Sequence, residues 1–244
     1  MWLSEFLRDQ FGSPSGLFGS LVVVPFLNLA NIGLIRDSIE LLQPREKDRV
    51  LDIGFGGGRS LVMLAERVPN GRVVGLDHSR DMVAAATHLI RERKLQRRVR
   101  LYRGDVLRLP FADASFDRVL TVNTIYYWPD VSVPLREIAR VLKPGGRLAL
   151  AFRSPATLWL ATSTWDKFRR YEPEEVAEAM RKAGFLTVRV MHQNAWRIPD
   201  NLIVVGECRR AKLRSPSSEP ASTKRTVTRR RSKKRPAARL ARTL

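Results

Sequence analysis

The chain has 244 residues, of which 44% are hydrophobic, and a formal net charge of +20. This apolar content is enough for a hydrophobic core and excludes a chain that is disordered throughout. The single cysteine, Cys208, excludes an internal disulfide framework, and with only three histidines we expect no metal site. A lone cysteine also fits a reducing compartment. We therefore expect a cytoplasmic protein, with peripheral contact to a membrane left open.

The first predicted feature along the chain is an apolar stretch at residues 16–35, which is about as long as a bilayer span. Pro25, Asn28 and Asn31 interrupt it. No basic region precedes it and no small-residue cleavage site follows it, so a signal peptide is not expected. We predict instead N-terminal helices over residues 1–40 that form a cap or lid, and membrane contact is the alternative.

Residues 49–206 alternate short β-branched runs with helical stretches, which is typical of a parallel sheet covered by helices on both faces. The predicted strands are 50–53, 73–76, 99–103, 118–122, 147–152, 186–191 and 202–205. The predicted helices are 60–68, 80–94 with Ser79 as N-cap, a stretch from about 132 to the stop signal Lys143-Pro144-Gly145-Gly146, and 173–182.

About ten residues separate the last two strands, which is too few for a parallel crossover, so these strands should form an antiparallel hairpin. We therefore predict an α/β domain over residues 41–208. Its expected fold is a Rossmann-like seven-stranded sheet, with six parallel strands, the last strand antiparallel, and helices on both faces.

The positive charge is concentrated in the last segment of the chain. Residues 209–244 hold 14 of the 44 Lys and Arg residues and one of the 24 acids, so they carry +13 and residues 1–208 carry +7. This segment has no aromatic residue and too few apolar ones to offset its ordering entropy. We predict a disordered basic tail that contacts nucleic acid or an anionic membrane nonspecifically, or that serves only solubility.

A buried strand runs into a glycine turn and then a helix at residues 50–58, VLDIGFGGG. A strand tip, a turn and a helix N-terminus together form a ligand-binding position in an open parallel sheet. A dinucleotide fingerprint requires glycine at position 59, where this chain has Arg59, and it normally lacks the acid at Asp52. The pattern therefore disfavours NAD. A turn that only connects a strand to a helix is the remaining alternative.

The acid-x-Gly-x-Gly-x-Gly pattern resembles the first motif of class I S-adenosylmethionine-dependent methyltransferases. By this resemblance, Asp52 orients the amino-acid portion of the cofactor and the glycines give it room. Asp77 then binds the ribose hydroxyls, and Asp105 and the backbone N–H of Val106 meet the adenine. The resemblance implies S-adenosyl-L-methionine as cofactor, bound by Asp52, Gly54, Gly56, Gly58, Asp77, His78, Asp105, Val106 and Asn123.

Two further segments narrow the resemblance. LPFADASFDRV at residues 109–119 and LREIARVLKPGGRL at residues 135–148 resemble the type 11, or ubiquinone/menaquinone-type, methyltransferase group. The resemblance covers about residues 40–208. Its motifs are specific for the fold and the cofactor, and much less so for the substrate.

Aromatic residues follow the fourth predicted strand, next to the expected position of the methyl group. The wall of an apolar acceptor pocket could be formed by Tyr126, Tyr127, Trp128, Trp159 and Trp165, of which we select Tyr126, Trp128 and Trp159. The alternative is that most of them belong to the core. If the acceptor needs a general base, the available residues are His78, Tyr126, Tyr127 and His192, of which we select His78 and Tyr126. No residue here has a family signature that identifies it as catalytic.

We therefore expect methyl transfer to a small hydrophobic acceptor, such as a lipid or a quinone. One alternative is a nucleic-acid-directed methyltransferase that is tethered by the basic tail. The other is a binding protein that keeps the cofactor fold without catalysis.

Overall fold

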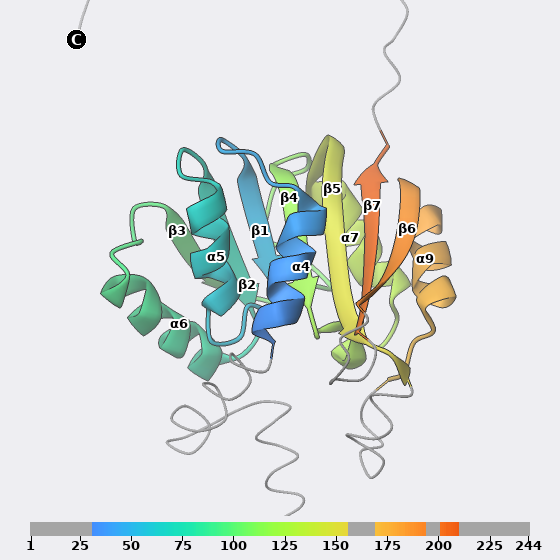
Figure 1. The fold of residues 1–244 in the computed structure, drawn as a ribbon, viewed down its shortest axis with the longest axis horizontal. Helices are drawn as coiled ribbons and strands as arrows, with labels where there is room; N and C mark the ends of the chain where they lie inside the picture. Colours follow the sequence, from blue (N-terminus) through green and yellow to red (C-terminus); the bar gives the residue numbers. More distant parts are fainter. Residues whose placement is uncertain (1–30, 156–168, 194–200, 210–244) are drawn as a thin grey trace, which may run out of the picture. The chain divides into compact units, whose positions relative to one another are not determined.

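The structure is a computed structural model that describes residues 31–155, 169–193 and 201–209 (Figure 1). These residues contain a seven-stranded sheet with the strand order β3-β2-β1-β4-β5-β7-β6. The strands are β1 (Arg49–Ile53), β2 (Arg72–Asp77), β3 (Val99–Arg103), β4 (Phe116–Val122), β5 (Leu142–Arg153), β6 (Phe185–Gln193) and β7 (Asn201–Cys208). Neighbours from β3 to β5 pair in parallel, and β7 is antiparallel to both β5 and β6. The predicted sheet is thus confirmed, including its antiparallel last strand.

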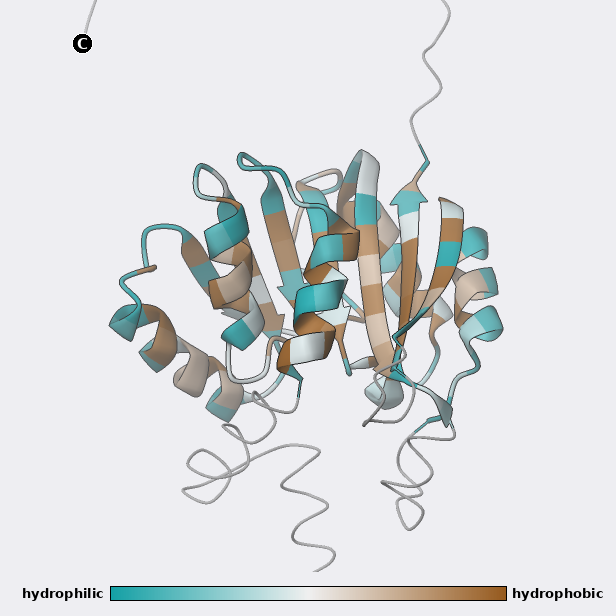
Figure 2. Cartoon of the chain, viewed as in Figure 1, coloured by the Kyte–Doolittle hydropathy of each residue, from teal (hydrophilic) through white to brown (hydrophobic). Residues whose placement is uncertain are grey.

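Helices from the described part of the chain cover both faces of the sheet. One face carries α4 (Ile32–Leu42), α5 (Arg59–Arg67) and α6 (Arg80–Glu92), and the other carries α7 (Ser132–Val141) and α9 (Pro173–Lys182) (Figure 1). Each face buries its own apolar cluster. Figure 2 shows the hydrophobic residues running along the central strands, as expected when a parallel sheet is covered on both sides.

Local sequence accounts for the element boundaries. In β1, Val50, Leu51 and Ile53 are at most 2% exposed, as their continuous apolar run predicts. At the start of α6, the Ser79 side chain accepts a hydrogen bond from the Met82 amide at 3.3 Å, which confirms the predicted N-cap.

Two boundaries differ from the predictions. The segment Lys143-Pro144-Gly145-Gly146, predicted as a stop before the fifth strand, lies inside β5, because Leu142 already pairs with Phe116 before a register shift leads to the pair Arg118 and Arg147. The expected boundary between the N-terminal cap and the α/β domain, at residue 40, falls within α4. The apolar side chains of this helix pack into the core. Several predicted features lie outside the described residues: residues 1–30 of the expected cap, Trp159 and Trp165, and residues 210–244 of the expected tail.

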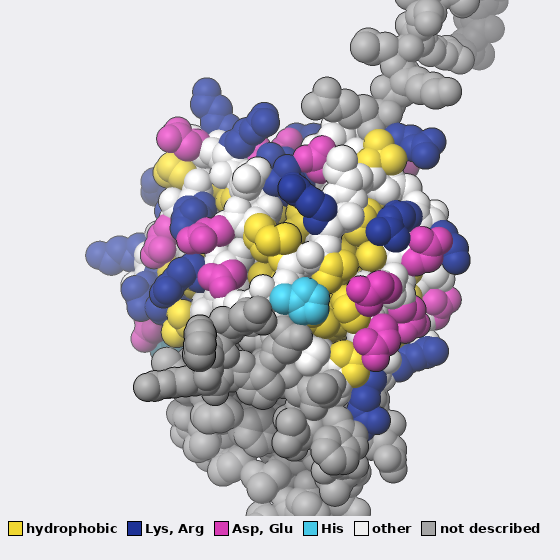
Figure 3. All heavy atoms as spheres, turned by 45° about the vertical axis from the view of Figure 1, so that its right-hand side comes forward, with side chains coloured by type: hydrophobic (Ala, Val, Ile, Leu, Met, Phe, Trp, Pro, Cys, Tyr) yellow, Lys and Arg dark blue, Asp and Glu magenta, His cyan; other side chains and the backbone are white. Residues whose placement is uncertain are grey.

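The surface of the described residues mixes both signs of charge with single apolar side chains. Figure 3 turns the β6 side of the sheet forward and shows apolar side chains lying among acidic and basic ones. On this edge strand, Leu186 and Met191 are more than 40% exposed. Among the helices of the described residues, none is long and apolar enough to cross a membrane.

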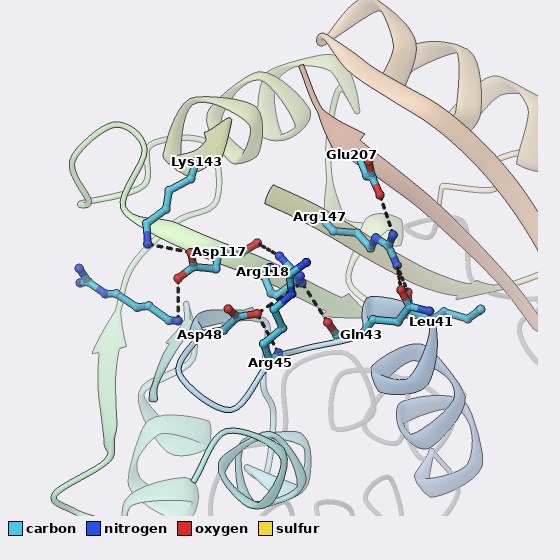
Figure 4. Close-up of polar contacts among 10 residues, drawn as sticks. Leu41, Gln43, Arg45, Asp48, Asp117, Arg118, Lys143, Arg147 and Glu207 are labelled. Carbon is cyan, nitrogen blue, oxygen red and sulfur yellow. Dashed lines mark hydrogen bonds and ion pairs between the residues drawn. The ribbon is translucent and has the colours of Figure 1, made fainter. Parts of the chain in front are cut away.

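A polar network joins the amino ends of the central strands to the end of α4 (Figure 4). The Arg118 guanidinium lies 3.5 Å from the Asp48 carboxylate and donates to the carbonyl oxygen of Gln43 at 3.2 Å. Both side chains of this ion pair are only 11% exposed. Burial lowers the pKa of Arg118, and the charge of Asp48 opposes that effect. The pair therefore holds β4 against the segment that leads into β1.

Replacing Asp48 by alanine is expected to lower the free energy of unfolding by about 3 kcal/mol, because it leaves the buried Arg118 without its counter-charge. The change also removes the acceptor for the Arg45 amide. Chemical denaturation measures the loss. The matched control is Glu178→Ala, which removes an exposed acid from an ion pair with Arg181 and should cost less than about 1 kcal/mol. Equal losses for the two variants would contradict a structural role for the buried pair.

Candidate functional site

The candidate site lies where the parallel strands reach their carboxyl ends. The chain builds β1, β2 and β3 outward and then returns to place β4 on the other side of β1, so the strand order reverses between β1 and β4. Open α/β sheets bind their ligands at such a switch point. Asp52 lies opposite Gly75 of β2 and Leu120 of β4, which places its backbone at this position.

Asp77, the last residue of β2, connects the glycine turn to the next helix. One carboxylate oxygen accepts a hydrogen bond from the Gly56 amide at 2.9 Å, and the other accepts from the Ser79 amide at 2.9 Å. The residue is 6% exposed. A carboxylate offers about four lone-pair positions, so these two bonds leave capacity for the hydroxyls of a ligand. Asp77 therefore fits the ribose-binding role that the sequence implied.

Asp52 is a buried carboxyl group that shares the site with Asp77. It is 1% exposed, and one of its oxygens accepts a hydrogen bond from the Ser60 hydroxyl at 2.5 Å. Burial raises the pKa of Asp52 to about 7, the Ser60 hydrogen bond lowers it, and the negative charge of Asp77 raises it further. Two acids whose charges repel one another favour a cationic ligand group at this site. The ammonium of the cofactor's amino-acid portion is such a group.

The glycines of the turn serve different purposes. A Cβ at Gly54 would lie 2.1 Å from Cγ2 of Thr124, and one at Gly58 would lie 2.9 Å from Cβ of Ala86. These two glycines therefore allow close packing inside the protein, which differs from the expectation that they make room for a ligand. A Cβ at Gly56 would meet nothing within 4 Å. Gly56 alone leaves open space beside the carboxylate of Asp77, and this space fits a bound cofactor.

Alanine substitutions at Gly54 and Gly56 are expected to affect different properties: stability at Gly54 and ligand binding at Gly56. Both residues have positive φ, +70° and +53°, so each change costs about 1–2 kcal/mol in backbone strain. Gly54→Ala should lose a further few kcal/mol from the clash with Thr124, and Thr124→Ser should restore part of this loss. Gly56→Ala should stay folded and bind S-adenosylhomocysteine more weakly. Thermal unfolding and calorimetric titration measure the two effects, and tight binding by Gly56→Ala would contradict the placement of the ligand.

Asp105 lies in the turn after β3, next to Gly104, whose amide donates to the Asp77 carbonyl oxygen at 3.0 Å. It is exposed, and its carboxylate accepts the Leu107 amide at 2.9 Å. The Val106 amide donates to no acceptor among the described residues. An exposed acid beside a free amide offers the acceptor and donor that an adenine edge requires.

The tip of β4 holds the predicted Asn123 and Tyr126 in one hydrogen-bonded group. The Tyr126 hydroxyl donates to Oδ1 of Asn123 at 3.0 Å and accepts from the Arg153 amide at 2.5 Å. Nδ2 of Asn123 donates to Oδ1 of Asn31 at 2.9 Å, immediately before α4. Asn123 has a φ of +56°, a conformation that asparagine tolerates better than most residues. This group fixes the end of β4 to β5 and to α4.

The aromatic residues after β4 are distributed differently from the prediction. Tyr126 and Trp128 are 5% and 4% exposed and belong to the core, so neither lines an open acceptor site. The short 3-10 turn η2 (Ile125–Tyr127) turns Tyr127 outward instead, where it is 47% exposed. Desolvation of its hydroxyl raises the pKa of Tyr127, and the negative charge of Asp77 raises it further.

The two candidate bases differ in their surroundings. Burial raises the pKa of Tyr126, and its hydroxyl is already committed to Asn123 and Arg153. The side chain of His78 is 67% exposed, with Nδ1 at 3.7 Å from the Asp77 carboxylate. His78 therefore lies beside the predicted ribose site. Among the described residues, no three His, Cys, Asp or Glu side chains gather into a set that could hold a metal ion.

Residues 51–150 match the family model described as a methyltransferase domain. The chain is 40% identical over 103 residues to methyltransferase GfsG of Streptomyces halstedii, covering 42% of this chain and 37% of that protein. It is 32% identical over 191 residues to a demethylmenaquinone methyltransferase of Roseiflexus sp. (strain RS-1), covering 66% of this chain and 79% of that protein. The chain thus spans well under half of the first relative and most of the second.

The fold is also found among solved structures. A SAM-dependent methyltransferase from Aquifex aeolicus superposes with a TM-score of 0.62 at 22% identity, covering 75% of this chain and 96% of that one. This likeness shows the fold. The family is shown by the sequence relatives, and the glycine turn with its acids agrees with it. The chain belongs to the class I S-adenosylmethionine-dependent methyltransferases, in the type 11 (ubiquinone/menaquinone-type) group.

Proposed function

We propose that this protein transfers a methyl group from S-adenosylmethionine to a small lipophilic acceptor of the quinol class. The observation that carries the proposal is the site at the ends of β1 and β2, where the Asp77 carboxylate holds the Gly56 amide beside open space. The relative from Roseiflexus, whose name specifies demethylmenaquinone, supports the class of acceptor.

The cofactor supplies a methyl group that is activated by a positively charged sulfur, so the acceptor gains this group and loses a proton. The chain then has to bind and orient both molecules and exclude water. Asp77 and Asp52 would hold the ribose and the amino-acid portion. Tyr127 would offer an exposed aromatic surface after β4, and such a surface suits an apolar ring or a sulfonium cation.

The chemistry of a quinol also reduces the need for a general base. Tyr126 is committed to structural hydrogen bonds, and His78 lies at the cofactor side of the site. The hydroxyl groups of a quinol donate electron density into its ring, so a ring carbon is already nucleophilic. The residues named here would therefore act mainly by positioning.

The test offers labelled S-adenosylmethionine to the full chain with three separate acceptor pools: a chemically reduced lipid extract, total RNA, and a mixture of water-soluble metabolites. Label is expected in the lipid pool, in a species that gains the mass of one methyl group. Label in RNA would show that the acceptor is nucleic acid and not a quinol. Incorporation that is unchanged in Asp77→Ala would exclude the site described here.

The predicted role of the basic tail needs a separate experiment, because residues 210–244 lie outside the described residues. The full chain is expected to be retained on RNA, DNA or anionic liposomes more strongly than a chain that ends at Arg210, with a steep dependence on salt. Retention is measured by cosedimentation and on immobilised nucleic acid. Equal retention of the two chains on all three surfaces would contradict a tethering role.

A further inference from the structure

Arg59 is placed where a cation is locally unfavourable. It is the first residue of α5 and follows Gly58, which serves as N-cap without a capping side chain. The amino end of a helix carries a partial positive charge, so an arginine there is repelled by the helix dipole. The first turn of α5 contains no acid that could compensate.

The Arg59 side chain is also unsatisfied. Its Nε atom is buried and has no hydrogen-bond partner, and among the described residues Arg59 takes part in no ion pair or hydrogen bond of its side chain. Buried polar groups in folded proteins almost always have partners, and an exception calls for an explanation. An anionic group bound next to Arg59 would satisfy Nε and oppose the helix dipole at the same time.

The neighbouring acids do not supply that anion. Asp52 is joined to Ser60, the residue after Arg59, and Asp77 accepts the amides of Gly56 and Ser79. The Asp52–Ser60 hydrogen bond fixes the first turn of α5 against β1. Side chains in a helix lean toward its amino end, which for Arg59 is the direction of the glycine turn.

We propose that Arg59 binds the carboxylate of the cofactor's amino-acid portion. This inference rests on the cofactor site described above. An amino acid carries an ammonium and a carboxylate on one carbon, and Asp52 and Arg59 present the opposite charges on β1 and on the adjoining first turn of α5. The amides at the amino end of α5 lack partners within the helix and would add donors for the same carboxylate.

The test compares two ligands by calorimetric titration of the full chain. One is S-adenosylhomocysteine, and the other is S-adenosyl-3-thiopropylamine, which lacks only the carboxylate. Wild-type protein is expected to bind S-adenosylhomocysteine roughly 10- to 100-fold more tightly than the analogue. Arg59→Gln should bind S-adenosylhomocysteine as weakly as the analogue, while its affinity for the analogue stays unchanged.

Two controls separate this role from a structural one. Arg67→Gln changes an arginine at the other end of α5, whose side chain is 51% exposed, and should alter neither affinity. The melting temperature of ligand-free Arg59→Gln should not fall, because the side chain makes no protein hydrogen bond that the change could break.

The outcomes that overturn the inference are distinct. Equal weakening of both ligands, or a lowered melting temperature, would show that Arg59 acts on the fold. Unchanged affinity for S-adenosylhomocysteine would show that the carboxylate binds elsewhere. If wild-type protein bound neither ligand, the cofactor site itself would be refuted along with the role of Arg59.

Discussion

Replacing Asp77 by alanine is expected to weaken the binding of S-adenosylhomocysteine by at least about a hundredfold. The reason is that a carboxylate at this position can accept hydrogen bonds from two ribose hydroxyls, and each charge-assisted bond contributes about 1.5–3 kcal/mol. The same carboxylate also accepts the amides of Gly56 and Ser79, so its loss loosens the glycine turn. Both effects act in the same direction on affinity.

A calorimetric titration of the variant measures this loss, and a second ligand separates its two causes. An analogue that lacks the ribose 2′-hydroxyl should bind wild-type protein more weakly than S-adenosylhomocysteine does, whereas Asp77→Ala should not distinguish the two. The control variant is Asp81→Ala, which removes a nearby acid from the first turn of α6. If Asp77→Ala still discriminated between the ligands, the ribose would be recognised by another group.

Replacing Asp52 by asparagine is expected to stabilise the ligand-free protein and to impair cofactor binding. The pKa of Asp52 is about 7 in the folded protein, against an ordinary value of 3.8. Because the folded state holds the proton more tightly, the wild-type protein loses stability as pH rises from about 4, and the loss is complete above about pH 7. Asparagine avoids this loss. The stability gained by the variant should therefore grow by about 3 kcal/mol between pH 5 and pH 8.

The same carboxyl group should make cofactor binding depend on pH. If the ionised form of Asp52 holds the ligand's ammonium, binding must expel a proton wherever the free protein keeps Asp52 protonated. The dissociation constant for S-adenosylhomocysteine should then be roughly tenfold higher at pH 6 than at pH 8. Titrations in buffers of different ionisation enthalpy should show release of nearly one proton at pH 6.

His78 is the control for this pH dependence, since histidine changes its charge in the same range and this one lies 3.7 Å from Asp77. The profile should persist in His78→Asn and disappear in Asp52→Asn. A profile that disappears in His78→Asn instead would assign the proton to the histidine. The raised pKa of Asp52 would be contradicted if the difference in unfolding free energy between Asp52→Asn and wild type stayed constant across this pH range.

The fold was largely predictable because its signals are local and agree with one another. The apolar run at 50–53, the N-cap at Ser79 and the short connection before β7 each dictate one step of the chain. The start of β5 was not predictable, because Leu142 extends the strand only by pairing with Phe116 across a register shift. Pairing partners that are far apart in sequence leave no local signal.

The places of Asp52 and Asp77 in the fold were predictable, because a motif ties these residue types to strand ends, while their binding roles stay predictions. The orientation of side chains was not predictable where the backbone conformation of a turn decides which of them face the core. The run of three aromatic residues at 126–128 gives no sign that Tyr126 and Trp128 face the core while Tyr127 faces outward. Arg59 was notable in the sequence only as a departure from a dinucleotide fingerprint. Its unsatisfied Nε became visible only with the packing around it.

The most direct test of the account is a calorimetric titration of S-adenosylhomocysteine into the full wild-type chain near pH 8, where Asp52 is expected to be ionised. The expected result is saturable binding of one ligand per chain that raises the melting temperature. The absence of saturable binding to folded protein would contradict the assignment of Asp52, Gly56 and Asp77 to a cofactor site.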